Sequence, residues 1–266
     1  FDTLLVEAQD ADGRVGVGEA TLLMGYTDET VGGAWELMQR LAADFPGVAP
    51  DRCAELAADV TKAAPFAATG LTTALEMLQA SCWLRVKEQT RVPLLAPVNG
   101  SEASELEVEV GQLLREGFGT LKVKVGFDAD VDSRRVRLIQ QVVAGRCLLR
   151  IDANQGYGRE QACAFAAALD PEGIELFEQP CAAGDWDAAR AVAAMSPVPV
   201  MLDESIYGID DIERAGELGA VRYIKLKLMK MGSLERLGQG IRRIRELGMG
   251  PVLGNGPVYR QVDELL

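Results

Sequence analysis

Histidine is missing altogether from this 266-residue sequence. Its absence excludes Ser-His-Asp and Cys-His catalytic groups, histidine general bases and histidine metal ligands in one step. Any acid-base catalysis must therefore use lysine, aspartate, glutamate, tyrosine or cysteine. The five cysteines contain no CxxC pair, and most of them lie in apolar stretches. Because a reduced cysteine in such a stretch behaves as a small hydrophobic residue, we predict a reducing, cytoplasmic location.

Long apolar runs and excess positive charge are lacking as well. No run approaches the roughly 18 to 20 apolar residues that cross a bilayer. The 27 Lys and Arg residues are outnumbered by 40 Asp and Glu residues, which gives a formal net charge of −13. A surface of that sign repels phosphate backbones and anionic lipids. We therefore expect neither nucleic acid nor a membrane as a partner.

The composition that is present, 48% hydrophobic and 25% charged residues, is that of a globular protein with a large core. Strand-like alternation at 3–7 and 14–19 surrounds a turn at 11–13. Helical spacing of apolar residues then covers three segments: 29–45, 52–63 and 69–87. Residues 1–90 are thus predicted to form a small α+β domain. We expect its N-terminal strand to be incomplete, because the sequence starts at Phe1 within strand-like sequence.

From residue 91 onward, short strand-like segments alternate with amphipathic helical segments. The expected strands are 94–98, 120–125, 147–151, 174–177, 200–202, 223–228 and 251–253. The expected helices are 104–116, 130–143, 159–168, 188–195, 210–218 and 234–247. Repeats of this kind favour an α/β fold with a (β/α)8-type, TIM-like barrel over an open doubly wound sheet. We assign seven barrel strands to residues 91–256, and expect a gap that includes the eighth strand before a tail at 257–266.

Five consecutive expected strands end in a charged residue. These residues are Lys124, Asp152, Glu178, Asp203 and Lys227. Their separations of 28, 26, 25 and 24 residues each correspond to about one βα unit, so all five are predicted at one rim of the barrel. That rim, at the C-terminal ends of the strands, is where barrel enzymes carry their active sites.

Asp152, Glu178 and Asp203 are predicted side by side on three neighbouring strands. Three carboxylates so close repel one another unless a hard cation lies between them. The all-oxygen donor set favours Mg²⁺, with Mn²⁺ as the alternative, and disfavours zinc. Capping of the following helix explains any one of these residues equally well, but it does not explain three in register.

Lys124 and Lys227 end the second and sixth expected strands, which are diametrically opposed in an eight-stranded barrel. A substrate bound at the metal would then have one lysine on each face. We expect one of the two to act as a general base near neutral pH. The pair suits removal of a proton from one face of a carbon acid and its return to the other face.

The residues around these positions match known motifs. They are KVKVG at 122–126, DAN at 152–154, EQP at 178–180, DES at 203–205 and KLMKMG at 227–232. With these motifs the chain resembles the enolase superfamily, and within it the muconate-lactonizing subgroup, over nearly its whole length. The absence of histidine excludes the branch that resembles mandelate racemase, which uses a His-Asp pair.

The resemblance implies a capping domain followed by a barrel, and a Mg²⁺ ion that binds the substrate carboxylate and stabilises the enediolate formed when the α-proton leaves. The implied metal ligands are Asp152, Glu178 and Asp203. The implied acid/base pair is Lys124 and Lys227, with Lys122 helping to neutralise the bound carboxylate. A homo-oligomer is also implied.

Further residues acquire expected roles from the same resemblance. Asn154 and Gln179 are expected to orient the carboxylates. Glu204 is expected to lie on the opposite strand face and to support the metal ligands without taking part in catalysis. Two cap loops, 22–26 and 64–68, are expected to carry specificity through Met24, Tyr26 and Phe66, although plain packing on the barrel rim also explains them.

Lys225 departs from the family pattern, which often has Asn or a small residue at this place. We expect its side chain to point to the same side as that of Lys227. Lys225 could shift the pKa of Lys227, pair with a carboxylate near the metal, or change substrate choice. The sequence leaves these alternatives open.

The sequence therefore predicts an isomerase that abstracts the α-proton of a small-molecule carboxylate with Mg²⁺. The favoured reaction is racemisation or epimerisation of an amino-acid derivative or dipeptide. The alternatives are a muconate-type cycloisomerase and a dehydratase like o-succinylbenzoate synthase. A non-catalytic barrel that serves as a binding module is the alternative from another class.

Overall fold

The structure of the chain is a computed structural model that describes residues 2–23, 26–85, 88–89 and 91–254. The chain divides into two compact units. Among the described residues, the cap unit comprises those within 2–89, 226–243 and 252–254, and the sheet unit comprises residues 91–225 and 244–251. In the described part of the chain, no helix has the length and apolar character that crossing a bilayer requires.

The cap unit begins with a β-hairpin of two antiparallel strands, β1 (Asp2–Gln9) and β2 (Val15–Leu22). Three helices follow: α1 (Val31–Asp44), α2 (Pro50–Asp59) and α3 (Pro65–Leu78). Strand β2 lies very close to α3, because a Cβ atom on Gly16 or Gly18 would lie 2.0 Å from a carbonyl oxygen of α3. Glycine at these two positions therefore allows the hairpin to pack on the helix.

Helix α3 is the centre of the cap unit. Nearly all of its residues are buried, and its N-terminus is capped by the Glu29 carboxylate, which accepts the backbone N–H groups of Phe66 and Ala67 at 3.1 and 2.9 Å. A negative charge at this end of a helix is favourable, since the first N–H groups have no partner within the helix. The charge of Glu29 thus fixes the start of α3 and the position of Phe66.

Two later helices, α9 (Leu228–Met231) and α10 (Leu234–Glu246), join the cap unit over residues 226–243. The Glu76 carboxylate on α3 accepts the N–H groups of Leu234 and Glu235 at 2.9 and 3.0 Å. A short 3-10 helix, η1 (Cys82–Leu84), places Trp83 against Gly238, where a Cβ atom would lie 2.3 Å from the indole ring. The cap helices and the start of α10 are thus held together by a charge-assisted cap and one aromatic contact.

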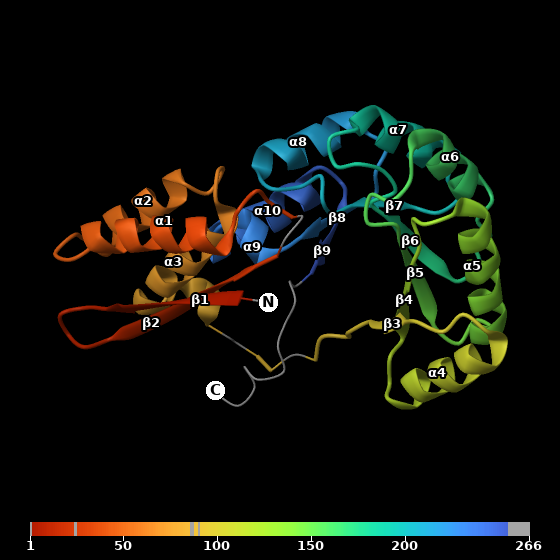
Figure 1. The fold of residues 1–266 in the computed structure, drawn as a ribbon, viewed down its shortest axis with the longest axis horizontal. Helices are drawn as coiled ribbons and strands as arrows, with labels where there is room; N and C mark the ends of the chain where they lie inside the picture. Colours follow the sequence, from red (N-terminus) through yellow and green to blue (C-terminus); the bar gives the residue numbers. More distant parts are fainter. Residues whose placement is uncertain (1, 24–25, 86–87, 90, 255–266) are drawn as a thin grey trace. The chain divides into compact units, whose positions relative to one another are not determined.

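The sheet unit is built on a parallel sheet in which strands follow their order in the chain. The strands are β3 (Ala96–Val98), β4 (Thr120–Lys124), β5 (Leu148–Asp152), β6 (Ile174–Glu178), β7 (Val200–Leu202), β8 (Tyr223–Leu226) and β9 (Gly250–Leu253). The intervening helices are α4 (Ala103–Arg115), α5 (Ala129–Val143), α6 (Arg159–Ala167), α7 (Trp186–Met195) and α8 (Ile209–Leu218). These helices follow one another along the outside of the curled sheet (Figure 1).

The predicted α/β architecture is confirmed as far as a curled parallel sheet of seven strands with covering helices. A closed eight-stranded barrel is not present within the described residues. The core of the sheet unit lies between the strands and helices, where Val123, Ile151, Phe165 and Leu176 are almost completely buried. Residues 257–266 and Met24, which the sequence singled out, lie outside the described residues.

Several predicted element boundaries were wrong; the helix expected over 52–63, for example, is Pro50–Asp59. The helix expected over 69–87 is α3, which begins earlier and ends at Leu78, because Ala80 takes a left-handed conformation (φ 52°) and breaks it. The strand expected over 223–228 ends at Leu226, and a helical turn begins at Leu228 and ends at Gly232 with φ 85°. Lys227 therefore precedes helix α9 and is not a strand residue.

The cap formed by Glu76 predicts a measurable contribution to stability. Replacing Glu76 by Leu leaves two N–H groups of α10 without their acceptor, so we expect the free energy of unfolding to fall by about 1–3 kcal/mol. Urea denaturation followed by circular dichroism measures this change. Glu76→Gln is the matched control, because its side-chain oxygen still accepts one N–H group; an equal loss in both variants would contradict the role of hydrogen bonding.

Candidate functional site

Four of the five charged residues predicted at the strand ends gather at the C-terminal edge of the sheet unit; the fifth, Lys227, belongs to the cap unit. In the sheet register Lys124 of β4 lies beside Asp152 of β5, and Asp152 lies beside Glu178 of β6. Asp203 directly follows β7. Three carboxylates on neighbouring strands are thus brought to one edge, and all three are at most 1% exposed.

Lysine ammonium groups lie between these carboxylates. Lys122 Nζ is 2.6 Å from Asp152 Oδ2 and 2.9 Å from Glu178 Oε2. Lys124 Nζ is 2.6 Å from the same Asp152 oxygen. Asp152 and Glu178 therefore each have an opposite charge at hydrogen-bonding distance, which is the condition under which proteins tolerate buried carboxylates.

Lys225 makes the remaining bridge. Its Nζ atom is 2.7 Å from Glu178 Oε1 and 3.4 Å from Asp203 Oδ2, and its side chain is 13% exposed. Of the alternatives that the sequence left open for this residue, pairing with carboxylates is the one that the structure shows. With Lys122 and Lys124 it brings the number of lysines in the cluster to three, equal to the number of carboxylates.

The pKa values of the cluster reflect burial and pairing together. Burial raises the pKa of Asp152, but the ammonium groups of Lys122 and Lys124 outweigh it and hold the pKa below its usual range. Burial and the neighbouring Asp152 charge raise the pKa of Glu178. Burial alone would lower the pKa of Lys225, but the two carboxylates that it bridges raise it above the ordinary value. The lysine therefore stays cationic in this arrangement.

Asn154 joins Lys124 to a fourth carboxylate. Its backbone N–H donates to Asp152 Oδ1 at 3.0 Å, its side-chain oxygen accepts from Lys124, and its Nδ2 donates to Glu204 Oε1 at 2.9 Å. Asn154 thus contacts Asp152 through its backbone N–H and not through its side chain, and its role in orienting the metal ligands stays a prediction. Glu204, expected in a supporting and not a catalytic role, accepts from the amide of Asn154, whose backbone is in left-handed conformation (φ 41°).

Glu204 is 93% buried, and its Oε2 atom has no hydrogen-bond partner among the residues that the structure describes. A buried acceptor of this kind calls for a water molecule or a donor from a ligand.

Gln179 holds the chain that follows β7. Its side-chain oxygen accepts the backbone N–H groups of Asp203 and Ser205 at 2.9 and 3.2 Å. Its Nε2 atom donates to the Cys181 carbonyl and to Ser205 Oγ at 2.9 and 2.8 Å. Gln179 was expected to orient the carboxylates themselves. It instead binds the backbone N–H of Asp203 and does not bind a carboxylate oxygen.

The loops after β4 and β5 touch each other beside the site. A Cβ atom on Gly156 would lie 2.2 Å from the Gly126 carbonyl oxygen, so no larger residue fits there. The buried Asp132 carboxylate accepts three backbone N–H groups of the β4–α5 loop and the Tyr157 hydroxyl at 2.6 to 3.1 Å. This network holds the chain directly after Lys124 in one conformation.

Lys227 lies in the cap unit, as does its neighbour Tyr26. It is 4% exposed, its Nζ atom donates to Tyr26 Oη at 3.1 Å, and the ammonium lies 4.6 Å from the centre of the Tyr26 ring. The ring face and the hydroxyl both stabilise a cation. Phe66, the other described residue expected to carry specificity, is 1% exposed and packs in the core of the cap unit.

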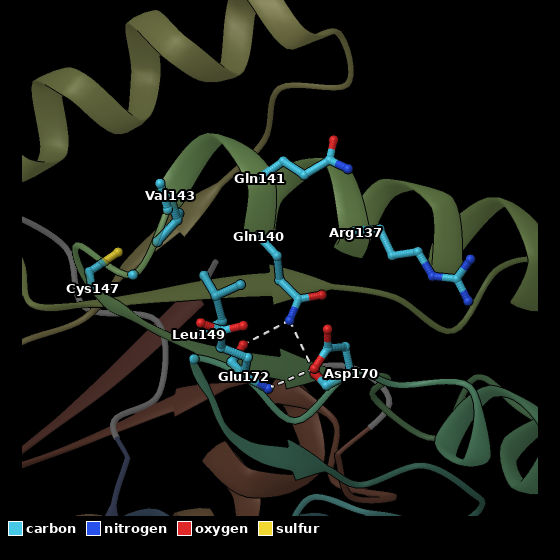
Figure 2. A pocket seen from close by; sticks show the side chains of 11 residues that line it. Arg137, Gln140, Gln141, Val143, Cys147, Leu149, Asp170 and Glu172 are labelled. Atoms are coloured by element: carbon cyan, nitrogen blue, oxygen red, sulfur yellow. Dashed lines mark hydrogen bonds between the residues drawn. The ribbon is translucent and has the colours of Figure 1, made fainter.

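A separate cavity of about 380 Å³ lies at the opposite edge of the sheet, near the start of β5 and β6. Figure 2 shows its lining, in which the Gln140 amide donates to the carbonyl groups of Asp170 and Glu172 at 3.1 and 2.8 Å. Cys147 and Arg137 also line it. Its polar groups serve the backbone, and none of the residues predicted to be functional reaches it.

The carboxylate cluster fits a divalent cation in the type, burial and adjacency of its donors. Asp152, Glu178 and Asp203 offer only oxygen, which hard cations such as Mg²⁺ prefer. In the arrangement described, no three Asp, Glu or Cys side chains among the described residues converge closely enough to hold a metal ion. The reason is that Lys122 and Lys225 lie between neighbouring carboxylates.

The fold and this site define a class of protein. A family model described as enolase C-terminal domain-like matches residues 105–260. This covers more than half of the chain, so the chain belongs to that family, as the motifs had predicted.

Comparison with known proteins finds relatives over most of the chain. An L-Lys-D/L-Arg epimerase from Methylococcus capsulatus is 31% identical over 88% of this chain and 69% of its own length. An aromatic dipeptide epimerase from Herpetosiphon aurantiacus is 31% identical over 94% of this chain and 73% of its own. The crystal structure of a dipeptide epimerase from Cytophaga hutchinsonii with Mg and the dipeptide D-Ala-L-Val has a TM-score of 0.86 and 25% identity, covering 96% of this chain and 72% of that one.

The hydrogen bonds of Gln179 predict that it is essential to the site's geometry. In Gln179→Leu, the N–H groups of Asp203 and Ser205 lose their buried acceptor, so we expect stability to fall by about 2–4 kcal/mol. Chemical denaturation measures this change. Gln179→Glu retains an acceptor for both N–H groups and should lose less; a larger loss in this variant would show that the donor side of Gln179 matters more.

Proposed function

We propose that this chain is a Mg²⁺-dependent epimerase of dipeptides. The observation that carries the proposal is the buried set of three carboxylates with lysines at the C-terminal edge of the sheet. The relatives described above, which are named epimerases, support the choice of reaction. The structural relative with bound Mg and dipeptide supports the choice of metal and substrate class.

In this proposal Asp152, Glu178 and Asp203 hold the metal ion. When bound, Mg²⁺ supplies positive charge that stabilises the substrate carboxylate as the neighbouring carbon loses its proton. The protein contributes the fixed placement of the ligands through strand register, and through Gln179 and Asn154. Lys122, which touches two of the carboxylates, adds positive charge beside the substrate carboxylate.

Lys124 and Lys227 are proposed as the acid/base pair. One lysine, as the neutral amine, takes the α-proton at Nζ, and the other, as the ammonium, donates a proton to the opposite face of the same carbon. The side chain of Lys124 is 47% exposed, so it can reach a ligand from its strand end. Tyr26 positions Lys227 through its ring and its hydroxyl.

The domain organisation, the location and the assembly of the chain are also proposed. The parallel curled sheet suits a closed (β/α)8 barrel over residues 91–256, with residues 1–90 as a capping domain and 257–266 as a tail. The proposed substrate is a small carboxylate. We also propose that the protein is cytoplasmic, which the composition supports, and that it forms a homo-oligomer, which the family resemblance supports.

Other reactions of the same residues are less favoured. Muconate-type cycloisomerisation and dehydration like that of o-succinylbenzoate synthase need only one lysine for chemistry. The named relatives reported above favour epimerisation over both. A non-catalytic binding barrel is also disfavoured, because none of the three carboxylates or the predicted lysines is lost from the chain.

The proposal predicts α-proton exchange of dipeptides in D₂O, followed by NMR. With Mg²⁺ present, deuterium should enter the α-position of a dipeptide residue and both epimers should form, while EDTA should abolish both signals. Removal of either lysine should slow epimerisation by at least about 100-fold, the usual contribution of a positioned acid or base.

The roles of Lys124 and Lys227 can be distinguished by the stereochemistry of the exchange. Lys124→Ala should lose exchange from one epimer and Lys227→Ala from the other, since each base serves one face. Lys62→Ala, an exposed lysine of the cap unit, is the matched control and should behave as the parent. Full activity in both active-site variants, or exchange that resists EDTA, would refute the assignment.

A further inference from the structure

Lys225 occupies a place between two carboxylates that a metal ion also requires. Its ammonium group contacts Glu178 Oε1 at 2.7 Å and Asp203 Oδ2 at 3.4 Å. Both carboxylates are 1% exposed, so neither can turn to solvent for compensation. A divalent ion held by Glu178 and Asp203 would need oxygens that the ammonium now contacts.

The backbone fixes Lys225 in this position. Ile224 of β8 is paired with Leu202 of β7, so the next residues along the two strands, Lys225 and Asp203, are neighbours. The lysine side chain is largely buried, at 13% exposed. This lysine is therefore a built part of the cluster and not a surface residue that happens to reach it.

The charges of the cluster balance without a metal ion. Three carboxylates carry three negative charges, and Lys122, Lys124 and Lys225 carry three positive charges. A divalent ion entering this set meets a neutral cluster, whereas without Lys225 it would meet a net negative one. Because the affinity of carboxylate sites for such ions rises with the net charge of the ligands, Lys225 works against metal binding.

We propose that Lys225 is an internal cation that competes with the divalent metal ion for Glu178 and Asp203, so that metal binding requires displacement of its ammonium group. The inference rests on the proposed function, since it presupposes a divalent ion at these carboxylates. Lys225 keeps the metal-free protein folded by neutralising the buried carboxylates, and it lowers the metal affinity in doing so.

The test is metal affinity, measured without substrate. Mn²⁺ binding is followed by the loss of the free-ion electron paramagnetic resonance signal, and Mg²⁺ binding by titration calorimetry. Lys225→Met removes the charge and retains an unbranched apolar side chain, so the Kd for Mn²⁺ should fall at least about tenfold. Lys225→Gln also removes the charge, so its Kd for Mn²⁺ should fall as well. It provides the same test if Lys225→Met does not fold.

Two further variants isolate the cause. Lys225→Arg retains the positive charge and should keep the weak affinity of the parent. Lys62→Met removes the same charge from an exposed position in the cap unit and should leave the Kd unchanged. If Lys62→Met binds Mn²⁺ as tightly as Lys225→Met, net charge explains the effect and the proposal is overturned.

Thermal unfolding supplies a second readout. Without metal, Lys225→Met should unfold at a lower temperature than the parent, since its carboxylates repel one another uncompensated. With saturating Mn²⁺ it should gain more degrees than the parent gains, because a competing cation is absent. Equal gains in both proteins would mean that Lys225 is only structural.

The outcomes separate this inference from the proposed function. If Lys225→Met binds Mn²⁺ more tightly than the parent, or binds it when the parent does not, the competition is supported. Unchanged or weaker binding by both uncharged variants, while the parent binds Mn²⁺, overturns the competition and leaves the metal-dependent function standing. Failure of the parent and every variant to bind either ion overturns both.

Discussion

Burial of three carboxylates at one edge of a parallel sheet is the constraint on which the rest of the sheet unit depends. Taking a carboxylate out of water costs several kcal/mol unless it gains an opposite charge and hydrogen bonds. Asp152, Glu178 and Asp203 are all almost fully buried, and each contacts at least one lysine. The strands must therefore deliver lysines and carboxylates to the same height, which explains why charged residues interrupt apolar strands at regular intervals.

The loops beyond the strand ends have to satisfy the same constraint. The chain turns sharply after β5 and β6, where Asn154 and Gln179 both adopt left-handed backbone conformations that cost energy in residues other than glycine. Each uses its amide to satisfy neighbouring polar groups: Asn154 joins Lys124 to Glu204, and Gln179 serves the backbone of Asp203. Hydrogen bonds made possible by the turns offset the strain of forming them.

Much of this arrangement could be predicted because it follows from period and register. Strands spaced by one βα unit must end at the same edge, so the gathering of Lys124, Asp152, Glu178 and Asp203 followed from their spacing alone. The contacts of Lys225 could not be predicted in this way. A lysine side chain is long, and its direction depends on which carboxylates remain unpaired. The end of β8 was also missed, because the alternation of apolar residues and lysines continues through Leu228, as in a strand, although a helical turn begins there.

The two proposed bases have different surroundings, and this difference bears on how the reaction can run in both directions. Lys124 is half-exposed and shares its charge with Asp152 and Asn154, whereas Lys227 is buried against the Tyr26 ring. A proton on Lys124 can exchange with solvent quickly, while a proton on the buried Lys227 is shielded from solvent. Under the proposed function, the epimer deprotonated by Lys124 would therefore exchange its α-proton with solvent more readily. A chain without histidine thus obtains two different bases from one residue type, because the environment of each lysine, and not its identity, sets its role.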